Sequence, residues 1–409
     1  MTQSTVNAKP VLGMAEFVML MAFMTSLVAL SIDAMLPALD VIGHHLGAKD
    51  IHESHLIVSL FFGGMAFGQL FFGPYCDARG RREAIMLGLG IFVMGTLVCM
   101  IADDMTTMLI GRLIQAFGVS GPRIASMAVI RDQFAGEAMA RVMSFIMMVF
   151  ILVPMIAPMV GQWVISVASW THIFTLFLVV SSGVGLWYFI RQPETLPVED
   201  RVPFSWAQFF RSSKFILTHR DVIGPTVAMG CVFGAFLSYI SASQTIFVGF
   251  YDVGDMFAYV FAFLAFSIGL ASYMNSRIVM RWGMKKVTSM ALYGVLVFSA
   301  VLVVEMVIFS GLPPLPLALI TLFIGFFFVG LLFGNLNAIA MQPLGKLAGI
   351  GAAIIGSLSS IISVPVAMGI DAFLTDNLYP IAIGFLIFFS LAKLVITPTL
   401  KAEPEPTES

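Results

Sequence analysis

The chain has 409 residues, of which 59% are hydrophobic and 11% are charged, and its mean hydropathy is +0.98. A soluble domain has about 45–50% apolar and about 25% charged residues, so this composition excludes a water-soluble globular protein and indicates an integral membrane protein. The formal net charge of −2 gives no broad positive field, so no nucleic-acid partner is expected.

Long apolar runs separated by charged or turn-rich gaps predict an all-α integral membrane protein with twelve transmembrane helices. The strands of a membrane β-barrel would instead alternate over about ten residues. Each run has about the 17–25 residues that cross a bilayer core when tilt is allowed. The predicted spans are 14–39, 56–75, 84–102, 106–129, 142–166, 171–190, 222–249, 255–277, 287–310, 315–338, 348–370 and 378–396.

Lysine and arginine placement predicts the orientation of these spans. If the N-terminus lies inside, the cytoplasmic segments contain nearly all of the cations, and the outer loops contain only Lys49. The positive-inside rule therefore predicts that both termini are cytoplasmic. The first apolar run is too long for a cleaved signal peptide and follows a single cation, Lys9, so we expect a retained first helix.

The longest internal gap divides six spans from six and predicts four regions. These are an N-terminal six-helix half, a cytoplasmic linker, a C-terminal six-helix half and a disordered tail, at 1–190, 191–221, 222–396 and 397–409. The linker contains aromatic and basic residues that predict a short amphipathic helix on the membrane surface: Phe204, Trp206, Phe209, Phe210, Arg211 and Lys214.

The segment "GQLFFGPYCDARGRRE" at 68–83 resembles the signature loop of the major facilitator superfamily, G-x-L-x-D-x-x-G-R-R/K. "GRLIQAFGVSG" at 111–121 and "PMIAPMVGQW" at 154–163 resemble motifs of its fourth and fifth helices, although Ala116, Ala157 and Gln162 replace glycines of those motifs. "SIDAMLPAL", "LSYISAS" and "GNLNAIAM" resemble the Bcr/CflA group of drug:proton antiporters. The resemblance implies the twelve-helix major facilitator fold and proton-coupled export.

The signature loop predicts a conformational latch on the cytoplasmic side, formed by Gly73, Asp77, Gly80, Arg81 and Asp132. Asp77 is expected to stabilise a nearby helix N-terminus, and Arg81 is expected to pair with Asp132 at the inner end of the fourth span. The alternative is a basic loop that only sets topology.

The fifth span has small residues and prolines on one helix face: Pro154, Ala157, Pro158 and Gly161. This pattern predicts either an antiporter-motif helix or ordinary close packing of membrane helices.

Asp33 lies inside an otherwise apolar run, where placing a carboxylate in the membrane costs free energy. Its helical face contains small and polar residues, so it is expected to face the interior of the helix bundle. Arg112 lies at a similar depth, roughly 9 Å below the outer surface, and is predicted to partner Asp33 across a cavity and to serve proton coupling. The alternative is a static buried ion pair. The predicted cavity residues are Asp33, Arg112, Gln115, Arg123, Phe236 and Tyr239.

Other polar residues carry weaker expectations. His44, His45, His52 and His55 are expected in a solvated outer loop, although clustered histidines can also sense pH or bind a metal. Glu305 is expected at the outer interface. Cys76, Cys99 and Cys231 lie far apart without a CxxC pattern, so neither a disulfide framework nor a metal site is predicted.

The sequence and the resemblance together predict a proton-coupled exporter of drug-like or small amphipathic solutes that works by alternating access. It is not expected to be an enzyme or to need a cofactor, because no large soluble domain and no nucleotide-binding loop are found. The resemblance implies that it can act as a monomer. The expected location is the bacterial cytoplasmic (inner) membrane, and the expected partners are protons, lipids and a small-molecule substrate. The alternatives are a transporter of one metabolite, such as an amino acid, sugar or siderophore, and a non-transporting membrane receptor.

Overall fold

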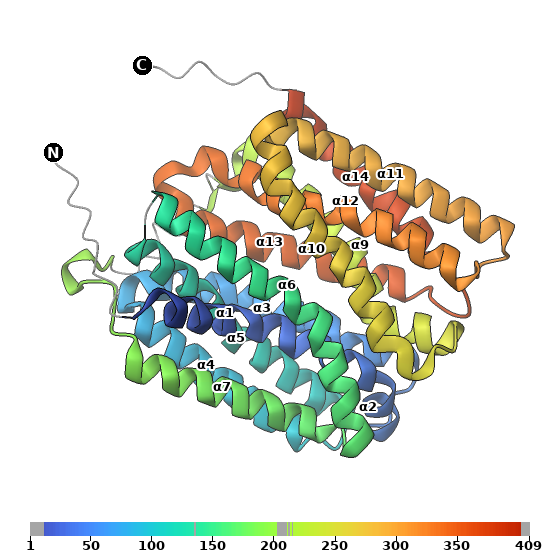
Figure 1. Ribbon diagram of the computed structural model, residues 1–409, viewed down its shortest axis with the longest axis horizontal. Coiled ribbons are helices and arrows are strands. Elements are labelled where there is room, and N and C mark those ends of the chain that lie inside the picture. Colours follow the sequence, from blue (N-terminus) through green and yellow to red (C-terminus); the bar gives the residue numbers. More distant parts are fainter. Residues whose placement is uncertain (1–11, 135, 203–210, 212, 215, 402–409) are drawn as a thin grey trace. The chain divides into compact units, whose positions relative to one another are not determined.

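A computed structural model describes residues 12–134, 136–202, 211, 213–214 and 216–401. The described residues form helices and contain no β-strand (Figure 1). Eleven helices among them are long and apolar enough to cross a membrane, and α6 contains a further apolar helix at Leu152–Val167. The fold is the predicted twelve-helix fold of an integral membrane protein.

The chain divides into two compact units. The first comprises the described residues of Met1–Trp206 together with Ser241–Ala265. Its elements are α1 (Met14–Asp33), η1 (Leu36–Ala38), α2 (Leu39–His45), α3 (Ile51–Arg79), α4 (Arg81–Met100), α5 (Met105–Gln133), α6 (Gly136–Val167), α7 (Thr171–Arg191), η2 (Val198–Asp200), the end of α9 (Arg220–Gln244), a π-helical turn η3 (Thr245–Phe250), η4 (Gly254–Met256) and the first part of α10 (Phe257–Trp282).

The second unit comprises the described residues of Ala207–Ile240 and Phe266–Ser409. It contains most of α9 (Arg220–Gln244) and of α10 (Phe257–Trp282), and then α11 (Met284–Ile308), α12 (Leu315–Met341), η5 (Gln342–Leu347), α13 (Ala348–Asp371) and α14 (Tyr379–Lys401). Within this unit α11 packs against α12 and α14, and α13 contacts both α12 and α14.

The units do not follow the predicted regions: residues 241–265 pack with the first unit rather than with the C-terminal half, and the boundary between Trp206 and Ala207 falls inside the predicted linker. The amide side chain of Gln244 donates to the carbonyl oxygen of Pro37 (3.1 Å) and accepts from the backbone N–H of Asp40 (3.1 Å). The end of α9 is therefore hydrogen-bonded to the segment that follows α1.

Two predicted segments fall partly or wholly beyond the described residues. The predicted surface helix of the linker rests on Phe204, Trp206, Phe209 and Phe210, which lie outside them. Residues 402–409 of the predicted tail lie outside as well. Residues 397–401 of that tail are helical, because α14 continues to Lys401.

Local chemistry explains several helix boundaries. Asp50 accepts the backbone N–H of Glu53 (3.0 Å) at the start of α3, and Asp104 accepts both the hydroxyl (2.6 Å) and the backbone N–H (2.9 Å) of Thr107 at the start of α5. These bonds hold the pKa of the Asp104 carboxyl below its ordinary value. The two aspartates thus satisfy N–H groups that have no partner within the helix.

Pro37 explains why α1 ends at Asp33. A residue at position 37 of a continuous α-helix would donate its N–H to the carbonyl of Asp33, and proline has no N–H to donate. The chain instead forms the short 3₁₀ turn η1 before α2 begins at Leu39. The side chain of Asp33 therefore lies directly at a break in the first transmembrane helix.

Close backbone contact organises the first unit. Helix α5 packs against both α3 and α4, and α4 packs against α7 (Figure 1). A Cβ atom added at Gly95 of α4 would meet the backbone of Gln115, and one at Gly118 of α5 would meet the backbone of Phe92. Glycine is the side chain that permits this approach of two membrane helices.

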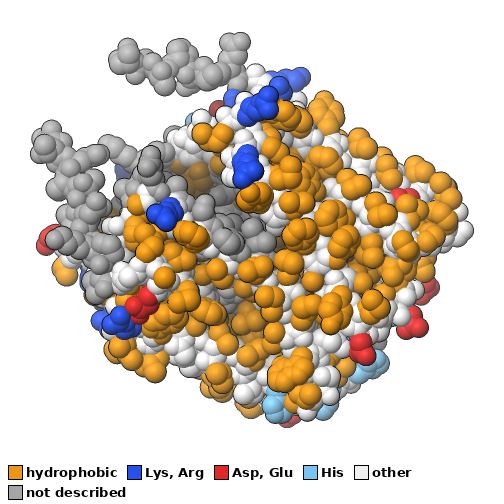
Figure 2. Space-filling model, viewed as in Figure 1, with side chains coloured by type: hydrophobic (Ala, Val, Ile, Leu, Met, Phe, Trp, Pro, Cys, Tyr) orange, Lys and Arg blue, Asp and Glu red, His pale blue; other side chains and the backbone are white. Residues whose placement is uncertain are grey.

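The surface agrees with a lipid environment. Figure 2 shows hydrophobic side chains over most of the visible face. Several large apolar side chains lie on the outside, such as Met94 (63% exposed), Trp163 (65%) and Leu394 (72%). Exposing so many apolar side chains to water is unfavourable, whereas contact with lipid chains is not. Apolar side chains cover the outside of the helices, so buried polar groups inside them need a separate explanation.

Candidate functional site

Asp33 is a buried acid at the end of α1. Its side chain is 6% exposed, whereas Met19 and Phe23 on another side of the same helix are 49% and 47% exposed. The inward orientation expected from helical spacing is therefore correct. Within the described part of the chain, Asp33 forms no salt bridge and no side-chain hydrogen bond.

Arg112 of α5 is fully buried and links three helices. Its guanidinium donates to the carbonyl oxygens of Ser31 (3.1 Å) and Ile57 (3.1 Å) and to Oε1 of Gln115 (2.5 Å). It also lies over the ring of Phe61, 4.2 Å from the centroid. Arg112 thus connects α5 to α1 two residues before Asp33, and to α3.

Asp33 and Arg112 form no ion pair, so the alternative of a static buried pair is not observed, and the predicted coupling between the two residues stays a prediction. The physical reason for the missing ion pair is that two carbonyl oxygens, an amide oxygen and an aromatic face already compensate the arginine charge. Gln115 is fully buried too, and its amide donates to the hydroxyl of Thr96 of α4 (2.8 Å). Arg112 and Gln115 have no exposed surface in this conformation, so the structure does not place them in the wall of an open cavity.

Helix α6 passes the break in α1 at very close range. Ala157, Pro158 and Gly161 are buried, and Pro154 is half-buried, so these four residues of the predicted motif share an inward face. A Cβ atom added at Gly161 would overlap the carbonyl oxygen of Ala34, the residue directly after Asp33. Gly161 therefore sets how closely α6 approaches the acid.

We expect Gly161→Ala to destabilise the protein by about 1–3 kcal/mol, because the added methyl must push α6 away from α1. Gly183→Ala in α7 is the matched control, since no atom lies within 4 Å of a Cβ added there. Thermal unfolding of both variants in detergent measures the difference. Equal unfolding temperatures for the two variants would show that the close approach has no energetic consequence.

The residues of the predicted latch meet at the ends of three helices. Arg81, at the start of α4, donates to Asp77 Oδ1 at the end of α3 (2.7 Å) and to Asp132 Oδ2 at the end of α5 (3.0 Å). It also donates to the carbonyl oxygen of Cys76 (2.9 Å). Gly73 lies in α3 and Gly80 joins α3 to α4. The expected Arg81–Asp132 contact is present, and its role as a latch stays a prediction.

Sequence reasoning missed Glu194, which follows α7. Its carboxylate accepts the backbone N–H groups of Arg81 (2.9 Å) and Arg82 (3.0 Å) at the start of α4. Neighbouring Thr195 donates its hydroxyl to Asp132 (2.8 Å). Gly80 has a φ of +117°, and a Cβ there would overlap Glu194. One signal in the sequence could have indicated a capping residue from elsewhere in the chain. Gly80 precedes α4, and glycine has no side chain that could cap the N-terminus of this helix.

Replacing Glu194 with glutamine should destabilise the protein by about 1–2 kcal/mol, the usual cost of a lost helix cap, because the neutral amide accepts these N–H bonds less strongly. Glu199→Gln is the control, since Glu199 is exposed and lies in the same segment. The free energy of unfolding, from denaturant titration in detergent, distinguishes the two. A control as unstable as Glu194→Gln would contradict the capping role.

The remaining predicted cavity residues are distributed between the two units. Arg123 of α5 has an exposed side chain. In the second unit, Phe236 (8% exposed) and Tyr239 (2%) lie in an aromatic cluster with Phe326 and Phe333, and the rings of Tyr239 and Phe326 are 4.5 Å apart. Both residues are thus packed among other rings rather than exposed.

One expectation about the outer histidines was wrong. His55 is buried (2% exposed) in α3, and its Nε2 lies 3.0 Å from the Thr245 hydroxyl, so it does not belong to a solvated loop. Helix α3 begins at Ile51 rather than at the predicted residue 56, which places His55 inside the helix. Glu305, near the end of α11, is 6% exposed and accepts a hydrogen bond from the hydroxyl of Thr321 (2.5 Å), and its depth at the outer interface stays a prediction.

Comparison with known proteins decides the family. The model of the Major Facilitator Superfamily matches residues 21–367. The chain belongs to the Major Facilitator Superfamily. An uncharacterized MFS-type transporter, YdgK of Bacillus subtilis, is 30% identical over 91% of this chain and 95% of its own length. A bicyclomycin resistance protein homolog of Haemophilus influenzae is 28% identical over 84% of this chain and 85% of its own length.

A solved structure supports the fold independently. The xylose transporter XylE of E. coli, in a partially occluded inward-open conformation, superposes with a TM-score of 0.76 at 12% identity, over 97% of this chain and 99% of its own. This likeness shows the major facilitator fold alone. The resemblance seen in the signature loop is confirmed, and the chain is a multi-pass membrane transporter of this superfamily with drug-resistance relatives at modest identity.

Proposed function

We propose that this major facilitator is a proton-coupled antiporter that exports drug-like or small amphipathic solutes by alternating access. The observation that carries the proposal is Asp33, a buried acid without a salt bridge in the described chain, at a break in the first transmembrane helix. The drug-resistance name of the Haemophilus influenzae relative supports the substrate class.

The physical argument concerns the charge of Asp33. An ionised carboxylate inside a membrane protein costs several kcal/mol unless a cation or hydrogen-bond donors compensate it. Arg112 does not provide this compensation, since its donors bind carbonyl and amide oxygens. The neutral acid is therefore favoured while Asp33 is buried, and the carboxylate becomes favourable when water or a cationic substrate reaches it. Protonation and substrate binding then compete at one position.

The available energy fits this mechanism. One proton moving down 100 mV releases about 2.3 kcal/mol, enough for roughly fiftyfold accumulation of a neutral solute. The transporter would need no cofactor, because the proton gradient drives it. We place it in the bacterial inner membrane as a monomer with both termini in the cytoplasm, on the basis of its cation distribution and its bacterial relatives.

The test is transport in proteoliposomes with an imposed pH gradient. The panel includes bicyclomycin, a lipophilic cation and a small sugar. We expect the antibiotic or the cation to move against its concentration in exchange for protons, and the sugar not to move. Transport of a metabolite alone, unaffected by the gradient, would favour a facilitator, and the absence of flux for every compound would favour a receptor.

A further inference from the structure

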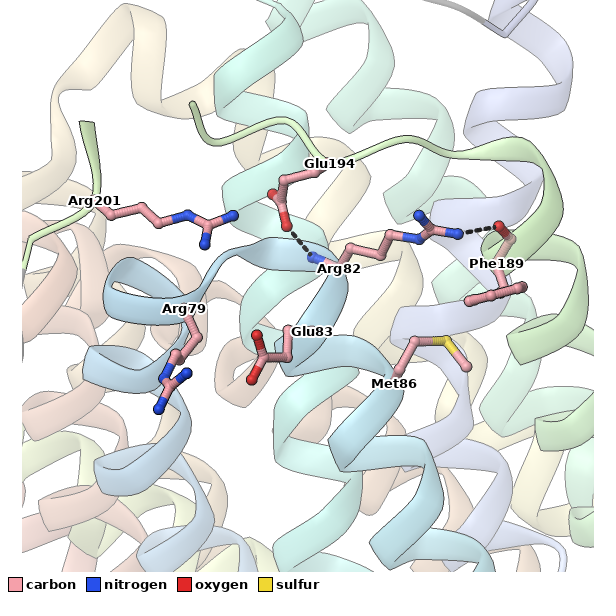
Figure 3. A pocket seen from close by; sticks show the side chains of 7 residues that line it. All are labelled: Arg79, Arg82, Glu83, Met86, Phe189, Glu194 and Arg201. Atoms are coloured by element: carbon pink, nitrogen blue, oxygen red, sulfur yellow. Dashed lines mark hydrogen bonds between the residues drawn. The ribbon is translucent and has the colours of Figure 1, made fainter. Parts of the chain in front are cut away.

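A pocket of about 330 Å³ lies in the first unit, where α4 begins and α7 ends. Three arginines line it, Arg79, Arg82 and Arg201, and Phe189 and Met86 give it an apolar side. Figure 3 shows Arg82 extending from Glu194 toward Phe189, above Met86, with Arg79 and Arg201 on the opposite side. The pocket belongs to the side that the cation count predicts to be cytoplasmic.

The two acids of this pocket are engaged elsewhere. Both oxygens of Glu194 accept backbone N–H groups at the start of α4. Glu83 accepts a hydrogen bond from the hydroxyl of Tyr75 (2.6 Å). Within the described part of the chain, none of the three pocket arginines forms a salt bridge. The pocket therefore presents three cations whose charge no neighbouring carboxylate neutralises by direct contact.

The arginines also hold unused donors. Arg82 donates one N–H to the carbonyl oxygen of Phe189 (2.7 Å) and lies over its ring at 4.4 Å, which fixes the direction of the guanidinium. The Nε atoms of Arg82 and Arg201 are buried, and neither has a hydrogen-bond partner among the described residues. Buried guanidinium donors without acceptors are costly, so an acceptor bound in the pocket would be stabilised.

The residues around the pocket indicate which kind of hydrogen-bond acceptor could bind there. Leu186, Phe189 and Ile190 of α7 are 60%, 51% and 68% exposed, so the lipid-facing surface of α7 continues up to the arginines. A ligand that has an anionic group and an apolar chain matches both parts of this site. Guanidinium groups bind phosphate oxygens with directed, charge-assisted hydrogen bonds.

We propose that this pocket binds the phosphate of an anionic phospholipid. Its headgroup lies among Arg79, Arg82 and Arg201, and its acyl chain follows Phe189 and Leu186 along α7. The bound lipid would satisfy the free Nε donors beside the Arg81–Asp132 contact, and it would stabilise the junction of α3, α4 and the segment after α7. The proposal does not depend on which solute the protein transports.

Native mass spectrometry of the purified full chain tests the site. The probes are dioleoyl-phosphatidylglycerol and dioleoyl-phosphatidylcholine, each titrated separately, and inorganic phosphate, added in competition with the bound phosphatidylglycerol. We expect one phosphatidylglycerol to bind at low concentration, the zwitterionic lipid to bind far more weakly, and millimolar phosphate not to displace the lipid. Equal binding of the two lipids, or full displacement by phosphate, would overturn the proposal, the second result in favour of a free-anion site.

The variants assign the binding to these residues. Arg79→Gln with Arg201→Gln should weaken phosphatidylglycerol binding roughly thirtyfold, about fivefold for each cation, and Arg82→Gln should weaken it about fivefold. Neither Arg79 nor Arg201 has a side-chain hydrogen bond to the described residues, so this double variant should fold. Arg281→Gln with Lys286→Gln removes the same charge from the second unit and should bind like the wild type. Wild-type binding by the pocket double variant would overturn the proposal.

Discussion

Replacing Asp33 with asparagine is expected to abolish export driven by a pH gradient while the chain remains folded. Asparagine has nearly the same shape and is neutral, so it mimics the protonated acid and cannot release a proton. The buried site loses no salt bridge, because none is found there within the described chain. Accumulation should therefore fall from roughly fiftyfold per proton at 100 mV to none. Proteoliposome uptake of the substrate found for the wild type measures this.

The matched control is Asp103→Asn, which removes an exposed carboxylate between α4 and α5 and should transport normally. Downhill flux of the substrate should persist in Asp33→Asn, which separates a loss of coupling from a loss of folding. Proton release on substrate binding that is unchanged in Asp33→Asn would show that another group carries the proton.

Much of the fold was predictable because lipid imposes simple rules. A span must be long and apolar, so hydropathy located the membrane helices, and helical spacing correctly placed Asp33 on an inward face. The break after Asp33 was less visible, since the predicted span ran from 14 to 39 without interruption. Pro37 was the available signal, because the residue four positions before a proline loses its hydrogen-bond donor.

The candidate site was only partly predictable. Membrane depth and helix face correctly predicted that Asp33 and Arg112 lie in the same region. They did not predict that Arg112 donates to the backbone carbonyls of Ser31 and Ile57. Every residue carries such a carbonyl, so no sequence pattern marks the two that bind an arginine. Glu194 was missed for a similar reason, because it is distant in sequence from the α4 N-terminus and acts on backbone N–H groups.

Arg112→Met is expected to lower the free energy of unfolding by about 2–4 kcal/mol and to reduce transport about a hundredfold. The arginine ties α5 to the carbonyl oxygens of α1 and α3, and hydrogen bonds from a charged donor contribute about 1.5–3 kcal/mol each, partly offset by relief of the buried charge. Without these bonds, the end of α1 that carries Asp33 can shift, and small displacements of a reacting group can cost about two orders of magnitude.

Arg112→Lys separates geometry from charge. A lysine keeps the positive charge but cannot direct separate donors to Ser31, Ile57 and Gln115 at once, so it should lose nearly as much transport as methionine. Arg123→Met, on the exposed side of the same helix, should retain wild-type stability. Denaturant unfolding and the pH dependence of proteoliposome transport are measured for all three variants. If Arg112→Lys transports like the wild type, the charge of Arg112 matters rather than its hydrogen bonds, and its assignment as the residue that positions α1 is wrong.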